Sequence, residues 1–237
     1  MRFNSWLAQL FWFWYAVGLA LMLFYRVPEA LGFSNGLFLF FYAVYAVSHL
    51  QGSLAGVLRM AAAIGIAAFL LEGVGAATGY PFGHYRYSPT LGLAFFGVPV
   101  AIAAAWIAVV VQGCMLAAPS SRALRALSAG GYAVMLDLVL DPVAHARGFW
   151  EWPSHDAVVA FHGVPWTNYA AWFAAAALLS LLVPAKYVAS GERQHAARLY
   201  QAMLLMFGLL AAKEALWGAA AVAACGMLWT EYRRRSL

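Results

Sequence analysis

The sequence predicts an all-α fold, a polytopic integral membrane bundle of seven or eight transmembrane helices. Hydrophobic residues make up 65% of the 237 positions, charged residues make up only 10%, and the mean hydropathy is +0.76. Soluble domains have about 45–50% apolar and about 25% charged residues, so a soluble fold would lack the charged groups that cover its surface. Because one crossing takes about 20 residues, we expect a single transmembrane domain over residues 1–237 with short connections.

The expected helices follow seven apolar runs, each rich in Ala and Leu and much longer than a typical strand. The runs cover residues 6–25, 36–50, 54–74, 92–116, 123–140, 166–183 and 199–229. In hydrocarbon a helix satisfies its own backbone hydrogen bonds, which favours helices for all seven runs. The first run lacks a small-x-small cleavage site, so we interpret it as a retained helix rather than a signal peptide. We detect no internal repeat.

The last run is ambiguous. Residues 199–229 would form a helix of about 46 Å at 1.5 Å per residue, and Lys213 and Glu214 lie in its middle, where charge is costly in lipid. With eight crossings, ten of the 14 Lys and Arg residues lie on one side and four on the other. With seven crossings this asymmetry is lost. The positive-inside rule therefore favours eight crossings, or a broken final segment, with both termini cytoplasmic in a bacterial inner membrane.

The charge and cysteine content do not indicate a nucleic-acid partner or a metal site. The net charge of +5 fits cytoplasmic loops rich in Lys and Arg. Cys114 and Cys225 both lie in apolar runs and make no ligand spacing. We identify no zinc, di-iron or nucleotide-binding motif, and expect no metal and no cofactor.

Acidic residues gather at one side of the predicted bundle. Of nine in the chain, Glu72, Asp137 and Asp141 lie at helix ends that face the same side, and Glu151 lies in the adjoining loop. Asp137 and Asp141 are four positions apart, so they share one helix face. Such a pair in apolar surroundings tends to separate into one protonated and one ionised group, which is the requirement for acid–base catalysis.

Structural roles for the same carboxylates stay open. Asp141 could cap a turn before Pro142, Asp137 could pair with an arginine, and Glu72 could form a buried salt bridge with Arg86. Aromatic residues make up 16% of the chain and are mostly expected at the membrane interface. Those near the carboxylates could instead line a pocket in which their ring faces stabilise a cation. These are Tyr80, Tyr85, Tyr87, Trp150, Trp152 and Trp166.

Several motifs follow one another between residues 71 and 172. The first is LEGVGAATGYPFGHYRY at residues 71–87, which resembles the signature Glu-x-x-Gly-x-x-Thr-Gly-x-Pro-Phe-Gly-x-Tyr-x-Tyr of the CruF-type carotenoid biosynthesis proteins. The further matches are GVP at 97–99 before Trp106, LDLVLDP at 136–142, GFWEW at 148–152 and GVPWTN at 163–168.

The resemblance implies a membrane-bound carotenoid hydratase. Such an enzyme adds water across the terminal carbon–carbon double bond of an acyclic end group, gives a tertiary alcohol and needs no redox cofactor. In this interpretation Asp137 or Glu72 is the acid and Asp141 the base, while His162, Asn168 and Tyr85 position the water. The residues expected to bind substrate are Tyr80, Phe82, Tyr85, Arg86, Tyr87, Trp150, Trp152, His162, Trp166 and Asn168.

Two other functions remain as alternatives. A carotenoid end-group cyclase or isomerase would form the same tertiary cation and lose a proton from it in a dry pocket. A carotenoid-binding or transport protein would use the carboxylates as structural pairs or as a proton path. The expected partners are a lipid-soluble carotenoid and membrane lipid, and association with other carotenoid enzymes or with further copies of the chain is left open.

Overall fold

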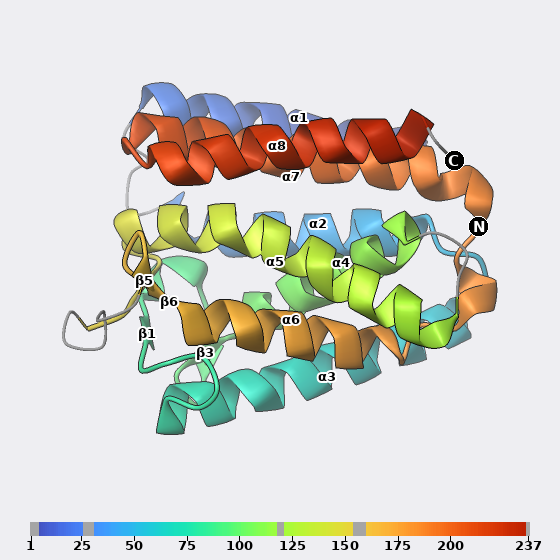
Figure 1. Ribbon diagram of the computed structural model, residues 1–237, viewed down its shortest axis with the longest axis horizontal. Helices are drawn as coiled ribbons and strands as arrows, with labels where there is room; N and C mark the ends of the chain where they lie inside the picture. The colour runs from blue at the N-terminus through green and yellow to red at the C-terminus, as the bar shows by residue number, and fades with distance from the viewer. Residues whose placement is uncertain (1–4, 26–30, 118–120, 154–159, 236–237) are drawn as a thin grey trace.

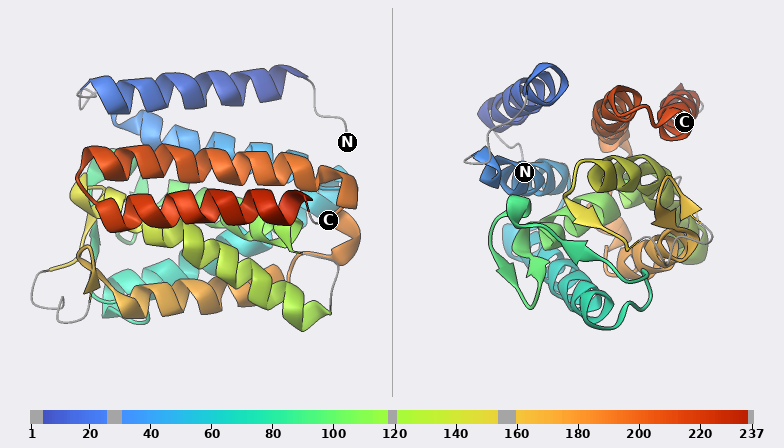
Figure 2. Two further views of the ribbon diagram at one scale, coloured as in Figure 1. Left: turned by 45° about the horizontal axis from the view of Figure 1, so that its top comes forward. Right: turned by 90° about the vertical axis from the view of Figure 1, so that its left-hand side faces the viewer.

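The computed structural model describes residues 5–25, 31–117, 121–153 and 160–235, which form an all-α bundle with three short strand pairs at one end (Figures 1 and 2). The eight helices of these ranges are α1 (Ser5–Phe24), α2 (Phe33–Ser48), α3 (Leu54–Thr78), α4 (Val100–Leu116), α5 (Arg122–Ala146), α6 (Trp166–Ser180), α7 (Arg193–Lys213) and α8 (Trp217–Arg235). The strands are β1 (Arg86–Tyr87), β2 (Ala94–Phe95), β3 (Val98–Pro99), β4 (Trp150–Glu151), β5 (Ala160–Phe161) and β6 (Val164–Pro165). Short 3₁₀ turns are η2 (Pro89–Leu91), η4 (Ala185–Tyr187) and η5 (Ser190–Glu192).

Four of these helices are long and apolar enough to cross a membrane. They are α1, α3, α5 and α7, with mean hydropathies of 1.8, 2.1, 1.4 and 1.2 over their best windows. The helices α2 and α4 are apolar but shorter. These helices confirm the expected all-α class and the expected association with a membrane.

The helix α4 forms the centre of the bundle. It contacts α2, α3, α5, α6 and α7, and every residue from Ala108 to Leu116 is buried. By contrast, α1 lies at the edge against α2 and α7, as Figure 2 shows, and Leu7, Phe11 and Tyr15 are its buried residues. Most of the apolar surface of α1 is therefore available to lipid.

Two predicted helix boundaries are wrong for identifiable reasons. The run 92–116 starts as a helix only at Val100, because residues 94–99 form the hairpin β2–β3. The helix α5 does not end near Leu140 but continues through Pro142 to Ala146. Proline removes one backbone hydrogen bond, and the helix persists here because residues 139–144 are all buried against their neighbours.

The ambiguous final run is two helices, as loop charge indicated. The chain turns between α7 and α8, with Ala215 at a positive φ of 59°. Nζ of Lys213 donates to the carbonyl oxygens of Met22 and Leu23 at the end of α1, both at 2.8 Å. Glu214 accepts from Arg147 at 3.0 Å, just past the end of α5. Lys213 and Glu214 thus lie at the turn between α7 and α8, where Lys213 binds the end of α1 and Glu214 binds Arg147 after the end of α5.

A short internal repeat, which we did not expect, positions the strand pairs. Residues 94–99 (AFFGVP) and 160–165 (AFHGVP) form the hairpins β2–β3 and β5–β6, which lead directly into α4 and α6. Phe96 and Gly97 have φ of 51° and 79°, and His162 and Gly163 have 51° and 84°. Two successive positive φ values are those of a type I′ turn.

The repeat extends to the helices on either side. Glu72 in Leu-Glu-x-Val corresponds to Asp137 in Leu-Asp-x-Val, 65 positions later, and Trp106 of α4 corresponds to Trp172 of α6. The strands β1 and β4, which precede the two hairpins, pair with each other in antiparallel fashion, with Arg86 opposite Glu151. The two helix–strand–hairpin–helix units therefore meet at one end of the bundle.

Replacing Lys213 with Met is expected to weaken the attachment of the end of α1 to the rest of the bundle. A cation at a helix C-terminus contributes about 0.3–1 kcal/mol at an exposed site, so the variant should unfold at a lower temperature in detergent. The matched control is Lys186→Met, since Nζ of Lys186 lies 5.9 Å from the ring centroid of Tyr187. Equal melting temperatures for the two variants would contradict the role of Lys213.

Candidate active site

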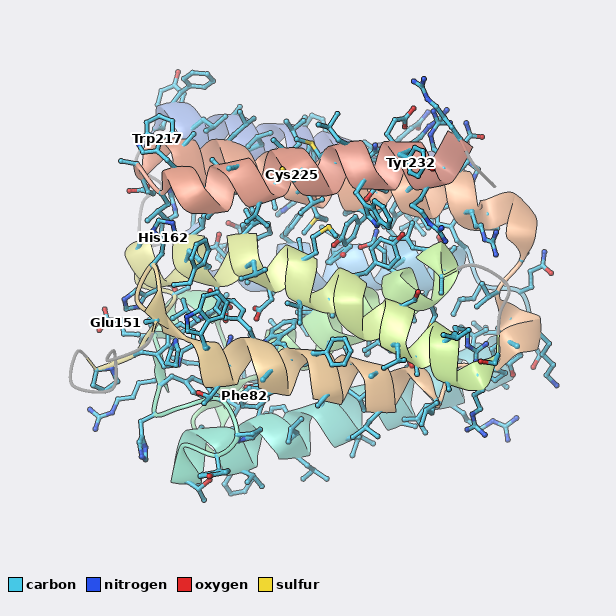
Figure 3. The ribbon with its side chains drawn as sticks, viewed as in Figure 1. Phe82, Glu151, His162, Trp217, Cys225 and Tyr232 are labelled. Carbon is cyan, nitrogen blue, oxygen red and sulfur yellow. The ribbon has the colours of Figure 1, made fainter. Side chains whose placement is uncertain are left out.

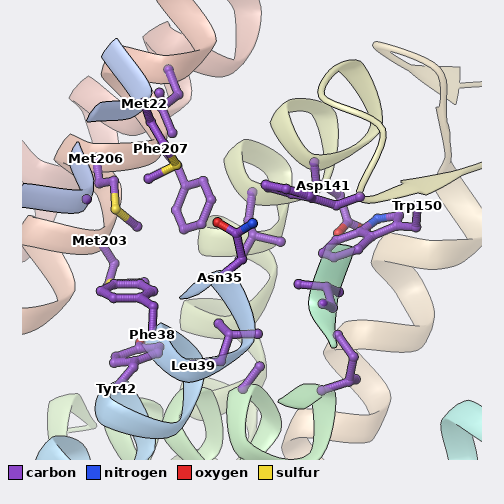
Figure 4. Close-up of a pocket in the computed structure, with 18 of the residues that line it drawn as sticks. Met22, Asn35, Phe38, Leu39, Tyr42, Asp141, Trp150, Met203, Met206 and Phe207 are labelled. Carbon is purple, nitrogen blue, oxygen red and sulfur yellow. The ribbon is translucent and has the colours of Figure 1, made fainter. Parts of the chain in front are cut away.

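A cavity of about 310 Å³ opens between the helices near the strand-pair end. Its wall is mainly apolar and comes from α1, α2, α4 and α7. Figure 4 shows Phe38, Leu39 and Tyr42 of α2 facing Met203, Met206 and Phe207 of α7 across it. The polar groups from α3, α5 and α6 that line the cavity are Glu72, Asp141 and Asn168. The cavity therefore fits an apolar molecule that brings one end to a carboxylate cluster.

Glu72 is held by three donors. Its Oε2 accepts hydrogen bonds from the hydroxyl groups of Tyr85 and Tyr87, the latter at 2.8 Å, and its Oε1 accepts one from Nε1 of Trp106 at 2.7 Å. The side chain is buried. A carboxylate accepts only, whereas a carboxylic acid must also donate its own proton. Three donors therefore match the acceptor capacity of a carboxylate.

Burial keeps the hydroxyl groups of Tyr85 and Tyr87 protonated. It raises the pKa of Tyr85 and Tyr87 above the usual range, and the charge of Glu72 raises the pKa of both further. Both hydroxyl groups therefore keep their protons and remain donors to Glu72. The strand β1 brings them there, because its pairing with β4 lays residues 85–87 across the end of the bundle.

Asp137 and Asp141 share a single amide group. Nδ2 of Asn168 donates to Oδ2 of Asp137 at 3.1 Å and to Oδ2 of Asp141 at 2.6 Å. All three side chains are buried. Oδ1 of Asp137 is buried with no hydrogen-bond partner among the described residues. Asp141 lines the cavity, whereas Asp137 is not among the residues that line it. Only one carboxyl group of the pair therefore faces the cavity.

Aromatic rings surround these carboxyl groups. Trp106 and Trp172, the equivalent residues of the two repeat units, stack with centroids 4.2 Å apart and an angle of 22° between their planes. Trp150 lies beside Asp141, as Figure 4 shows. Trp152 is fixed by a hydrogen bond of 3.3 Å from its Nε1 to the carbonyl oxygen of Phe82. Ring faces in a water-poor site attract positive charge.

The structure brings most of the predicted site residues together. Glu72, Phe82, Tyr85, Tyr87, Asp141, Trp150, Trp152 and Asn168 line the cavity.

Four predicted substrate-binding residues lie away from the cavity wall. Tyr80 is 80% exposed and Trp166 is 47% exposed. Arg86 is also exposed, on β1. His162 packs against Gly218 at the start of α8, and Figure 3 shows it between α5 and the turn before α8. Their expected part in substrate binding has no support from the position of their side chains.

The structural alternatives for the carboxylates differ from the observed contacts. Glu72 bonds to Tyr85, Tyr87 and Trp106 rather than to Arg86. Asp141 lies inside α5 rather than at a turn. The ion pairs among the described residues include none with Asp137.

Among the cavity residues that were not predicted as site residues, three carry groups that bear on the chemistry. Asn35, in the first turn of α2, adds an amide to the mainly apolar wall (Figure 4). Trp106 and Trp172 line the cavity as a stacked pair. The repeat spacing could have identified the two tryptophans, and an amide at the start of an apolar run was the available signal for Asn35.

Two glycines of α3 provide a matched test of the Glu72 environment. A Cβ at Gly75 would lie 2.6 Å from the ring of Phe82 and 3.0 Å from the hydroxyl of Tyr85, whereas one at Gly73 would have nothing within 4 Å. Overpacking typically costs about 1–3 kcal/mol, so Gly75→Ala should lower the melting temperature. Gly73→Ala should raise it slightly, since Ala in a helix is favoured over Gly by about 0.5–1 kcal/mol. The same sign of change in both variants would argue against this packing.

Comparison with known proteins places these features in a family context. A family model described as carotenoid biosynthesis protein matches residues 32–230. The chain is also 31% identical over 183 residues to the bisanhydrobacterioruberin hydratase of Haloarcula japonica. That alignment covers 68% of this chain and 59% of the relative, so the chain spans less than two thirds of the relative's length. No solved structure matches the chain. The family match extends well beyond the motifs at 71–172 and leaves out α1.

Proposed function

Because this chain belongs to the carotenoid biosynthesis protein family, we propose that it hydrates the terminal double bond of an acyclic carotenoid end group to a tertiary alcohol. The observation that carries the proposal is the buried Asp137–Asp141–Asn168 cluster at the end of an apolar cavity. The name of the Haloarcula japonica relative, a hydratase, supports the same reaction class. The reaction needs no redox cofactor because water addition changes no net oxidation state.

We further propose that all eight helices cross the inner membrane of a bacterium, with both termini cytoplasmic. The start of α1 and the end of α8, with Arg233, Arg234 and Arg235, lie at the same end of the bundle, opposite the strand pairs (Figures 1 and 2). Basic residues are retained on the cytoplasmic side. The carboxylate cluster then lies toward the opposite face, where lipid-borne substrate and water can meet.

The size of the cavity limits which part of the substrate it holds. Its volume of about 310 Å³ is at the low end of ligand pockets, which span about 300–1,000 Å³. A long polyene is about as long as the hydrocarbon core is thick, about 30 Å. We therefore propose that the end group of the carotenoid enters the cavity while the rest of the polyene stays in lipid. Phe13 and Val17 of α1 line the cavity and are also exposed, which puts the entrance beside α1.

The aspartate pair is the proposed source of the proton. Two carboxyl groups bonded to one amide repel each other when both are ionised, so the state with one shared proton is favoured. Asp141 reaches the cavity and delivers this proton to the less substituted alkene carbon. Glu72, held as an acceptor by three donors, is a poor acid. This favours the aspartates over the alternative of Glu72 as proton donor.

The second half of the reaction returns the proton. Protonation moves the π electrons into the new C–H bond and leaves a tertiary cation on the carbon with two methyl groups. The Glu72 carboxylate and the Trp106 and Trp172 rings lower its energy. Water attacks the cation, a C–O bond forms, and the doubly charged aspartate pair accepts the released proton. We assign the binding of that water to the amide of Asn35 and the hydroxyl of Tyr85, which both line the cavity.

The decisive experiment expresses the chain in cells that accumulate lycopene and resolves the pigments by chromatography and mass spectrometry. We expect a more polar pigment, heavier by one water, with one deuterium at the carbon next to the alcohol when the reaction runs in heavy water. Asp141→Asn and Asp137→Asn should each reduce product at least about 100-fold, since positioned acid–base groups contribute about 10²–10⁴.

The matched control is Glu151→Gln, a carboxylate at the same end of the bundle that is exposed and outside the cavity. It should retain full activity. A product of unchanged mass would replace hydration with cyclisation or isomerisation, and pigment that co-purifies unchanged would indicate binding without catalysis. Full activity in both aspartate variants would exclude the proposed proton donor.

Filling the cavity should block the reaction without unfolding the protein. Gly18 of α1 lines the cavity, and a Cβ built on it has nothing within 4 Å. Gly18→Leu is expected to reduce hydration at least about tenfold because one misplaced contact can cost that much or more, with an unchanged melting temperature. Gly131→Leu, also at an open position but outside the cavity, is the control. Equal activity in the two variants would show that the end group does not pass α1.

A further inference from the structure

Three potential metal ligands meet at the end of the bundle opposite the strand pairs. Nδ1 of His49 lies 2.9 Å and Nδ1 of His195 lies 3.1 Å from the same oxygen, Oε2 of Glu192. One ligand atom from each residue can be chosen so that all three lie within 4.8 Å of one another. His49 follows α2, Glu192 ends η5 and His195 lies in the first turn of α7. None of the three takes part in the cavity or in the proposed hydration.

We propose that His49, Glu192 and His195 bind one divalent cation of the zinc class. Zinc takes imidazole nitrogen and carboxylate oxygen at about 2.0–2.2 Å in tetrahedral sites, which places neighbouring ligand atoms about 3.3 Å apart. The observed separations of 2.9 and 3.1 Å are close to that spacing. Two imidazoles with one carboxylate suit zinc and similar transition metals rather than calcium or magnesium, which prefer oxygen ligands.

The sequence contains part of this site in a recognisable form. Glu192 and His195 make a Glu-x-x-His pair, three positions apart at the start of α7. This pair was not identified as a metal-ligand spacing from the sequence. His49 could not be added from the sequence, because it lies 143 positions before Glu192.

The surrounding backbone is arranged independently of these three side chains. The N–H of Gln51 donates to the carbonyl oxygen of Tyr187 at 2.8 Å, which joins the two loops that carry the ligands. A Cβ at Gly52 or Gly56 would lie within 2.9 Å of the Tyr187 side chain, so two glycines allow this close approach. The imidazole of His49 packs edge-on against Tyr45, with ring centroids 5.0 Å apart. The loops are thus held together before any ion binds.

A metal could reach this site from solvent. The side chain of His195 is 49% exposed and that of Glu192 is 33% exposed, while His49 closes the inner side at 16%. A site with three protein ligands on one side and an open outer position fits this pattern. Since α2 and α7 both contribute to the cavity wall, the ion would join the far ends of two helices that shape the cavity.

The test uses the full chain in detergent, purified without a polyhistidine tag and stripped with a chelator. Titration with Zn²⁺ against a chromophoric indicator should show one equivalent bound. Co²⁺ should give the intense visible absorption of a tetrahedral ion. His49→Ala and His195→Ala should each weaken zinc binding at least about tenfold, because even outer partners of a metal site commonly contribute about 10–100-fold. His84→Ala, an exposed histidine at the other end, should bind zinc as the wild type does.

Thermal unfolding provides a readout that is independent of the indicator. Zinc should raise the melting temperature of the wild type and of His84→Ala, because a ligand that binds only the folded state stabilises it. It should leave Glu192→Gln, which preserves side-chain size, unchanged. No saturable binding, or equal affinity in the wild type and His49→Ala, would overturn the proposal and leave a hydrogen-bonded cluster. Hydration activity is not part of this test, so its failure would not affect the proposed reaction.

Discussion

The hydrogen bonds of one buried carboxylate determine how the end of the bundle that holds the candidate site is built. A charged group taken out of water is costly unless it is paired or fully hydrogen-bonded, and Glu72 is buried in α3. Its donors are Tyr85 and Tyr87, in and beside β1, and Trp106 of α4, so the loop after α3 must cross the end of the bundle to supply them. The same crossing pairs β1 with β4 and brings Trp150 to the cavity.

The two repeat units make equivalent backbones but different sites. Glu72 and Asp137 occupy corresponding positions, yet Glu72 has three donors while Asp137 shares one amide with Asp141, which has no counterpart in the first unit. A saturated carboxylate keeps its charge, whereas a crowded pair readily holds a proton. In the proposed reaction, this asymmetry separates the group that stabilises positive charge from the group that transfers a proton, and it arises from a single additional aspartate.

The solvent around the bundle explains where polar groups occur. Lipid cannot satisfy them, so they lie at helix ends or in enclosed clusters. Lys213 fastens the end of α1 through two carbonyl oxygens, and His49, Glu192 and His195 gather at the opposite end. Between these ends α4 is packed on all sides while α1 is mostly exposed. In the proposed reaction, the substrate would therefore meet the carboxylates near α1, the helix with few buried residues.

The sequence by itself determined the all-α class, the membrane environment, the family and the grouping of Glu72, Asp137 and Asp141 at one side, because composition, helical periodicity and loop charge are local properties. It also indicated the break in the last run, which α7 and α8 confirm. Only the tertiary structure decided which partner each polar group takes. The contacts of Glu72 with Trp106, of Asp137 with Asn168 and of His49 with Glu192 join residues 31 to 143 positions apart. Such pairs depend on how the helices pack, and a local sequence pattern does not predict that packing.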